Sequence, residues 1–157
     1  MTTPDTCPDC GANVLNGREG CEALWHELFY TGVTGGSAFD AYCMQRLGKY
    51  CASAKSYAAH LTRLCCGMEY DANPHIYAAI QKWLNGNRQL EKPDIPPFLG
   101  ALTIVNVRDA PTPAERDRMA RAWVDSVWAA YESQHELART WIQQAVAFSA
   151  SPSHKRK

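Results

Sequence analysis

The chain lacks an excess of charge of either sign: lysine plus arginine number 16, aspartate plus glutamate number 16, and the formal net charge is zero. Proteins that coat nucleic acid are usually strongly basic, so this balance argues against a nucleic-acid partner. No apolar run approaches the length of a membrane span. The first residues contain no basic stretch followed by an apolar run, which is the pattern of a secretory signal. We therefore expect a cytoplasmic protein without a membrane segment.

Several motifs of known chemistry are also missing. The chain contains no G-x-G-x-x-G, no phosphate-binding loop and no G-x-S-x-G, so nucleotide binding by those routes is not supported. The cysteine count of seven is odd, and these residues therefore do not all pair as intrachain disulfides. In a reducing cytoplasm, the thiols near the N-terminus are better interpreted as metal ligands than as bridges.

The length of 157 residues and the apolar fraction of 46% suit one folded domain with a core. We expect a single helical domain over residues 1–150, with a zinc knuckle over residues 1–20 and a disordered tail over residues 151–157. Apolar periodicity predicts helices over about residues 21–30, 37–47, 53–69, 73–84 and 113–148. Pro93, Pro96 and Pro97 exclude a helix over residues 87–111, where the β-branched run 102–107 predicts one short extended segment. The predicted class is thus all-α, a bundle of about five helices.

The segment Cys7-Pro8-Asp9-Cys10-Gly11 predicts a zinc knuckle, because the turn directs both sulfurs to one point and glycine avoids a Cβ clash. Cys21 supplies a third thiolate. His26 is the nearest candidate for a fourth ligand and completes the pattern C-x2-C-x10-C-x4-H. If a helix already begins at Cys21, His26 is poorly directed, and His60 or His135 is then the alternative. The competing interpretation is a bare turn with reduced thiols.

A second group of candidate site residues lies in the predicted helices. His60 and His135 both share apolar helix faces, and Asp40 is a plausible acceptor for a histidine ring. Brought together, the three would hold a metal at an open site or form an acid–base pair. The simpler interpretation is two core histidines with satisfied hydrogen bonds. The five tryptophans and the four later cysteines are likewise interpreted as core residues.

Taken together along the chain, the cysteine motif, Asp40, His60 and His135 resemble the pattern of an uncharacterised bacterial family, domain of unknown function 5946. The resemblance covers about residues 7–141. The resemblance directs attention to the residues that match the family's pattern: Cys7, Cys10, Cys21, Asp40, Tyr42, Gln45, His60, Trp128 and His135. One departure is that the family commonly shows His-Pro after the glutamine, where this chain has Arg46-Leu47. The family has no established reaction, so the resemblance implies no enzyme class.

The leading hypothesis is a zinc-binding protein of unknown biochemical role, whose ion is held by Cys7, Cys10, Cys21 and a histidine and is mainly structural. One alternative is a metal-dependent enzyme of the hydrolase or lyase type that uses Asp40, His60 and His135. Another is a protein-interaction module. The sequence leaves open whether the partner is a protein or a small-molecule substrate, and whether the chain forms a homo-oligomer.

Overall fold

The computed structural model describes residues 6–30, 37–86 and 89–150, and within these ranges the chain forms helices and no strand. The predicted all-α class is confirmed. The elements are α1 (Gly17–Tyr30), α2 (Ala38–Gln45), α3 (Leu47–Tyr50), α4 (Ala54–Glu69), α5 (Pro74–Leu84), α6 (Ile104–Arg108), α7 (Pro113–Ala130), the 3-10 helix η1 (Glu132–Gln134) and α8 (His135–Ala150). The predicted tail, residues 151–157, lies outside the described residues.

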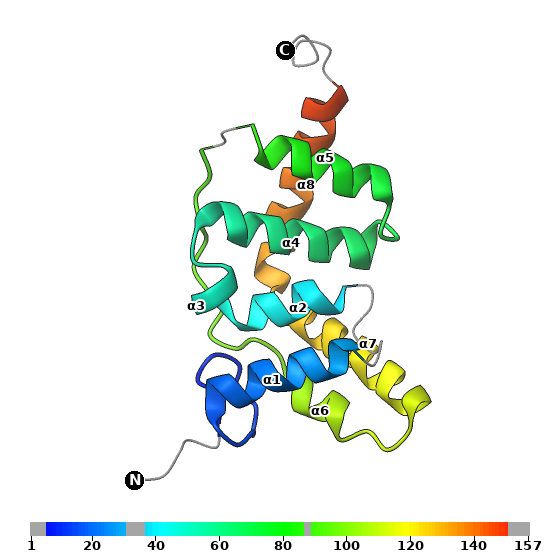
Figure 1. Cartoon of the computed structure of the whole chain (residues 1–157). Coiled ribbons are helices and arrows are strands. Elements are labelled where there is room, and N and C mark those ends of the chain that lie inside the picture. The colour runs from blue at the N-terminus through cyan, green and yellow to red at the C-terminus, as the bar shows by residue number, and fades with distance from the viewer. Residues whose placement is uncertain (1–5, 31–36, 87–88, 151–157) are drawn as a thin grey trace.

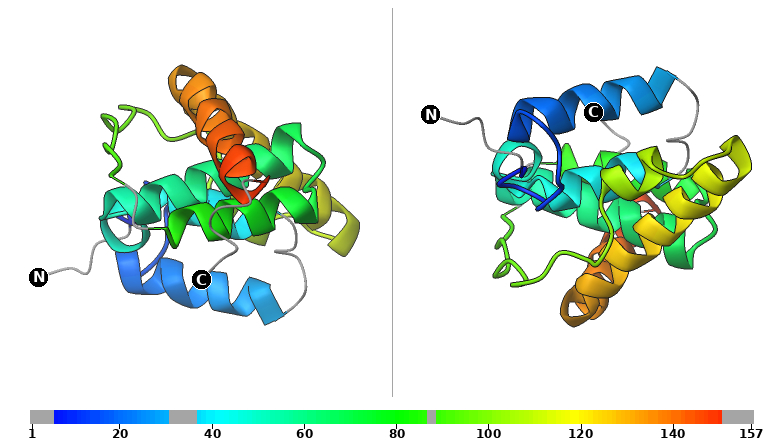
Figure 2. Two further views of the ribbon diagram at one scale, coloured as in Figure 1. Left: turned by 90° about the horizontal axis from the view of Figure 1, so that it is seen from above. Right: turned by 90° about the horizontal axis from the view of Figure 1, so that it is seen from below.

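The helices pack in two connected groups (Figure 1). In the upper group, α8 packs against α4 and α5; in the lower group, α7 packs against α2 and α6, and α1 packs against α6. The α2–α4 contact joins the two groups. Figure 2 shows that α1 and α8 lie on opposite sides of the layer formed by α4 and α5. In Figure 1 the N-terminal segment, residues 6–16, lies at the lower end of the molecule, whereas α5 lies at the upper end.

Two helix starts follow the sequence signals. The Asn73 side chain accepts hydrogen bonds from the amides of His75 (2.8 Å) and Ile76 (3.4 Å), and proline follows it in the first turn of α5. The Thr112 hydroxyl accepts a hydrogen bond from the Glu115 amide at 3.2 Å, and Thr112 thereby caps the start of α7. Such side-chain acceptors satisfy the amides that an N-terminal turn leaves without helical partners.

The expected extended segment over 102–107 is wrong, because Ile104–Arg108 forms the short helix α6. The Thr103 side chain accepts from the Val105 amide at 3.3 Å, and the Asn106 side chain accepts from the Thr103 amide at 2.8 Å. This reciprocal cap outweighs the β-preference of the branched side chains, and both Ile104 and Val107 are buried against the core.

The single long helix expected over 113–148 is also interrupted. The chain leaves α7 at Tyr131, passes through η1 and continues as α8. Neither glycine nor proline causes the break; buried hydrogen bonds hold it instead. The Tyr131 hydroxyl donates to the Met44 carbonyl oxygen at 2.6 Å, and the Tyr57 hydroxyl donates to Gln134 at 2.7 Å. Tertiary contacts therefore decide a feature that local propensity does not.

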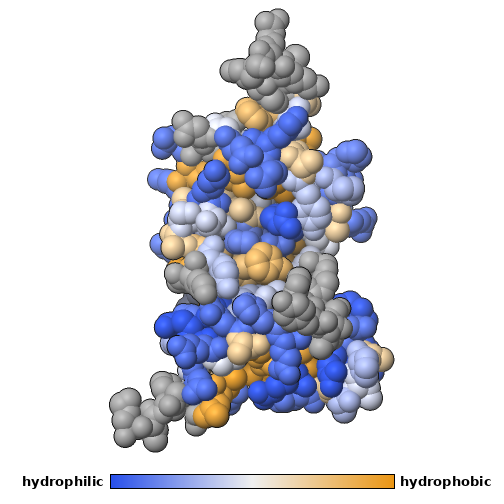
Figure 3. Space-filling model, viewed as in Figure 1, coloured by the Kyte–Doolittle hydropathy of each residue, from blue (hydrophilic) through white to orange (hydrophobic). Residues whose placement is uncertain are grey.

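The core is rich in aromatic side chains and thiols. All five tryptophans and the four later cysteines are buried, which confirms their interpretation as core residues; the cysteines are Cys43, Cys51, Cys65 and Cys66. Burial raises the pKa of both the Cys51 and the Cys65 thiol to about 12, so these groups stay protonated near neutral pH. On the face seen in Figure 3 hydrophilic residues predominate, and apolar residues show both in its upper part and along its lower edge.

Candidate metal site in the N-terminal segment

The turn that carries Cys7 and Cys10 is held by its own backbone. The Gly11 amide donates to the Cys7 carbonyl oxygen at 2.8 Å, and the Cys7 amide donates to the Ala12 carbonyl oxygen at 2.8 Å. Gly11 has φ +80°, a left-handed conformation that glycine adopts without steric cost. An isolated antiparallel bridge between Thr6 and Asn13 closes the loop. The sequence CPDCG thus forms the tight turn that was predicted for it.

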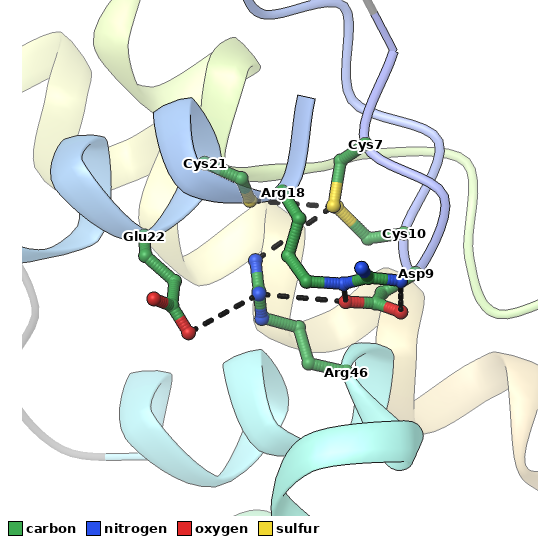
Figure 4. Close-up of polar contacts among 7 residues, drawn as sticks. All are labelled: Cys7, Asp9, Cys10, Arg18, Cys21, Glu22 and Arg46. Atoms are coloured by element: carbon green, nitrogen blue, oxygen red, sulfur yellow. Dashed lines mark hydrogen bonds and ion pairs between the residues drawn. The ribbon is translucent and has the colours of Figure 1, made fainter. Parts of the chain in front are cut away.

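The third thiol comes from α1, which begins earlier than predicted, at Gly17. The loop before this helix packs closely on its first turns, because a Cβ at Gly20 would overlap the carbonyl oxygen of Leu15. The Cys21 side chain is therefore held directly against the turn. Its sulfur lies 3.7 Å from the sulfur of Cys10, and both Cys21 and Cys7 are buried (Figure 4).

The thiols of Cys7, Cys10 and Cys21 form a group that can hold a metal ion, with all three sulfur atoms within 4.8 Å of one another. In the described part of the chain it is the only such group of three or more His, Cys, Asp or Glu side chains. His26, the predicted fourth ligand, lies exposed on α1 and is not part of the group. The alternatives His60 and His135 do not belong to it either.

Arg46 reaches this cluster from the α2–α3 junction, although it is far from the cysteines in sequence. Its side chain is fully buried, and its Nη1 lies 3.7 Å from the sulfur of Cys7. Its Nη2 forms ion pairs of 3.4 Å with Asp9 and with Glu22. Asp9 is also held by Arg18, whose Nε and Nη2 donate to the two carboxylate oxygens at 2.9 and 3.3 Å (Figure 4).

These contacts change the acidity of the thiols. The hydrogen bond between Cys10 and Cys21 lowers the pKa of Cys21, and the charge of Arg46 acts in the same direction against the effect of burial. The same Cys10–Cys21 hydrogen bond, together with burial, raises the pKa of Cys10. A thiolate is the form of cysteine that binds metals, and the contacts between Cys10 and Cys21 favour it at Cys21.

The structure brings together two of the three residues proposed for catalysis. Nδ1 of His60 lies 2.9 Å from Oδ1 of Asp40, which also accepts from Nε of Arg63 at 3.3 Å. Asp40 is almost completely buried between α2 and α4. The pair therefore has the form of a histidine oriented by a carboxylate, and it also joins the two helices.

His135 lies elsewhere. Its Nε2 is 2.7 Å from the carbonyl oxygen of Trp128, and its ring stacks on the Trp128 ring with 3.7 Å between centroids. The ligand atoms of Asp40, His60 and His135 do not converge among the residues that the structure describes. His135 instead supports the turn between α7 and α8, as expected of a histidine with a satisfied hydrogen bond.

Gln45 and Tyr42, two residues that match the family's pattern in the sequence, hold neighbouring elements against α2. The Gln45 amide nitrogen donates to the carbonyl oxygens of Leu99 (3.0 Å) and Leu102 (2.9 Å), and its oxygen accepts from the Trp123 indole at 2.9 Å. Gln45 thereby ties the proline-rich connection and α7 to α2. The Tyr42 ring stacks on Trp25 of α1, with 4.5 Å between centroids.

The chain is thus an all-α protein with a three-cysteine group that can hold a metal. It belongs to the family of unknown function DUF5946, whose model matches residues 5–132, and the resemblance seen in the sequence is confirmed. No curated protein and no solved structure matches the chain significantly. None of the helices within the described ranges is long and apolar enough to cross a membrane.

Proposed function

We propose that the protein binds one zinc ion through the thiolates of Cys7, Cys10 and Cys21, and that the ion fastens the N-terminal segment onto α1. The observation that carries this proposal is the convergence of three sulfurs from two separate segments. Two sulfurs on a tetrahedral zinc, with bonds of about 2.3 Å, lie about 3.8 Å apart. The sulfurs of Cys10 and Cys21 are 3.7 Å apart.

The role proposed for the ion is structural. Two backbone hydrogen bonds and an isolated bridge hold the loop that carries Cys7 and Cys10. An ion that links this loop to Cys21 adds its binding free energy to the stability of the folded state. His26 is exposed, so the proposal relies on the three cysteines and not on that histidine.

The test is a metal count on purified protein reconstituted with zinc and then freed of excess metal. We expect one zinc per chain in the wild type, no tightly bound zinc in Cys21→Ser, and one zinc per chain in Cys66→Ser. Cys66 is the matched control, because it is a buried thiol that is not part of the cluster. A wild-type protein without zinc, or a Cys21→Ser variant that keeps it, would refute the proposal.

The Asp40–His60 pair supports a second candidate, an enzyme that uses acid–base chemistry. A buried carboxylate that holds one ring nitrogen orients the histidine, so that the other ring nitrogen can transfer a proton. The test is to assay His60→Gln and His135→Gln against a panel of hydrolase and lyase substrates. A folded His60→Gln variant that loses an activity retained by His135→Gln supports this candidate. An equal effect of both substitutions, or no activity in the wild type, contradicts it.

A further inference from the structure

Arg46 is a fully buried cation beside the cysteine cluster. It follows the last residue of α2, so the helix itself does not account for its position. The helix ends at Gln45, and the backbone of Arg46 leaves the helical region with φ −121° and ψ 55°. This break separates α2 from α3. A buried guanidinium normally requires hydrogen-bonding or charged partners, since its desolvation is costly.

The two terminal nitrogens of this guanidinium contact different chemistry. Nη2 faces the carboxylates of Asp9 and Glu22, which are partly exposed. Nη1 donates to the sulfur of Cys7 at 3.7 Å, and the positive charge of Arg46 also lowers the pKa of Cys21. One candidate ligand therefore receives a hydrogen bond from this buried cation, and a second one is influenced by its charge.

A metal ion bound by the three thiolates would add a further negative charge beside this guanidinium. A divalent ion with three thiolates carries a net charge of minus one, and burial makes such a charge unfavourable unless a cation lies close by. Arginine is always protonated and offers donors only, so it does not coordinate the ion itself. Hydrogen bonds from outside the ligand set also orient the ligands and influence how tightly they bind the ion.

We propose that Arg46 is the positioning residue and counter-cation of the metal centre. Its guanidinium donates to the sulfur of Cys7, offsets the negative charge of the thiolate complex and connects the N-terminal segment to the α2–α3 junction. This inference rests on the proposed metal site. It adds a requirement for a cationic donor, contributed by a residue that lies 39 positions after Cys7 in the chain.

The experiment uses the full chain titrated with Co²⁺, which replaces zinc and gives a sulfur-to-metal charge-transfer band. Affinities are measured against a competing chelator for the wild type, Arg46→Met, Arg46→Lys and Arg18→Met. Arg18 is the matched control: it pairs with the same Asp9 carboxylate, but 55% of its side chain is exposed. Circular dichroism and a thermal melt of each metal-free variant establish that it is folded.

We expect Arg46→Met to weaken Co²⁺ binding by about 10- to 100-fold, the range typical for the loss of a partner that supports metal ligands. Its charge-transfer band moves to longer wavelength, because the thiolates lose a hydrogen-bond donor that lowers the energy of their lone pairs. Arg46→Lys keeps the positive charge and recovers most of the affinity. Arg18→Met stays within a few-fold of the wild type.

A folded Arg46→Met with wild-type affinity and an unmoved band would overturn the proposal. So would an Arg46→Lys variant as weak as Arg46→Met, since the charge would then not be the cause. If Arg46→Met does not fold, Arg46→Gln, which removes the charge and keeps a polar side chain, takes its place: weaker Co²⁺ binding in Arg46→Gln than in Arg18→Met supports the proposal, and equal affinities oppose it. If the wild type gives no charge-transfer band, the metal site itself is wrong, which is a separate result.

Discussion

Removal of the metal is expected to lower the stability of the protein and to release its N-terminal segment first. Zinc that binds only the folded state, at a free concentration 1,000 times its dissociation constant, stabilises that state by about 4 kcal/mol. For a domain of this size, each kcal/mol shifts the melting temperature by about 2–4 °C. We therefore expect metal-free protein to melt about 8–16 °C below the zinc-bound form.

The structure also predicts where protection is lost. The amides of Cys7 and Gly11 are held by single hydrogen bonds within the turn, whereas α8 lies in the upper helix group. Hydrogen exchange should therefore accelerate at these two amides on chelation and change little in α8. A verified metal-free sample with an unchanged melting temperature, or with exchange that accelerates equally everywhere, would refute the structural role of the ion.

Three further predictions follow from other contacts. Gly20→Ala should weaken zinc binding in a competition assay despite the better helix propensity of alanine, because its Cβ displaces the loop; equal affinity contradicts this. Gln45→Leu should lower the free energy of unfolding in urea by about 3 kcal/mol or more, because it leaves the buried hydrogen-bonding partners of Gln45 unsatisfied. The double variant Gln45→Leu with Trp123→Phe should lose less stability than the sum of the two single variants, and strict additivity contradicts this coupling. Arg139 lowers the pKa of Glu69 through hydrogen bonds of 2.7 and 2.8 Å, so the pair stabilises the fold above the unfolded carboxyl pKa of about 4.3 and loses this contribution as pH falls below it. Arg139→Gln should therefore flatten slightly the pH dependence of the melting temperature between about pH 3 and 5, and an unchanged slope would show that the pair has no influence.

Helices that carry a complete local signal are predictable from the sequence. An asparagine cap followed by proline defines the start of α5, and a threonine cap followed by proline defines the start of α7. In both, the side chain that satisfies the first amides lies in the same few residues as the helix itself. The information needed is local, so reasoning from the chain alone succeeds.

The two incorrect elements depend on contacts that are distant in sequence or on a less familiar cap. Residues 104–107 combine high β-propensity with a reciprocal cap between Thr103 and Asn106, and the cap determines the outcome. The break after α7 depends on the bond from Tyr131 to Met44, 87 positions earlier. Apolar periodicity continues through this break, so the pattern gives no indication of it.

The cysteines of the candidate site are evident from their spacing, but their environment is not. Cys7, Cys10 and Cys21 lie within one short segment and come together as the motif predicts. Arg46 lies 39 positions after Cys7, and the sequence distinguishes it only as a departure from the family's usual residues. A charge partner contributed by another helix requires the three-dimensional arrangement, because no local spacing relates it to the cysteines.

The interruption at Arg46 has a consequence for the tolerance of the chain to insertions and deletions. Successive side chains in an α-helix turn by about 100°. Adding or removing one residue within α2 would therefore rotate the guanidinium away from the sulfurs and place another side chain beside them. The length of α2 is expected to be constrained by this angular relation, whereas the exposed stretch around Glu91 can accept a changed length without altering it.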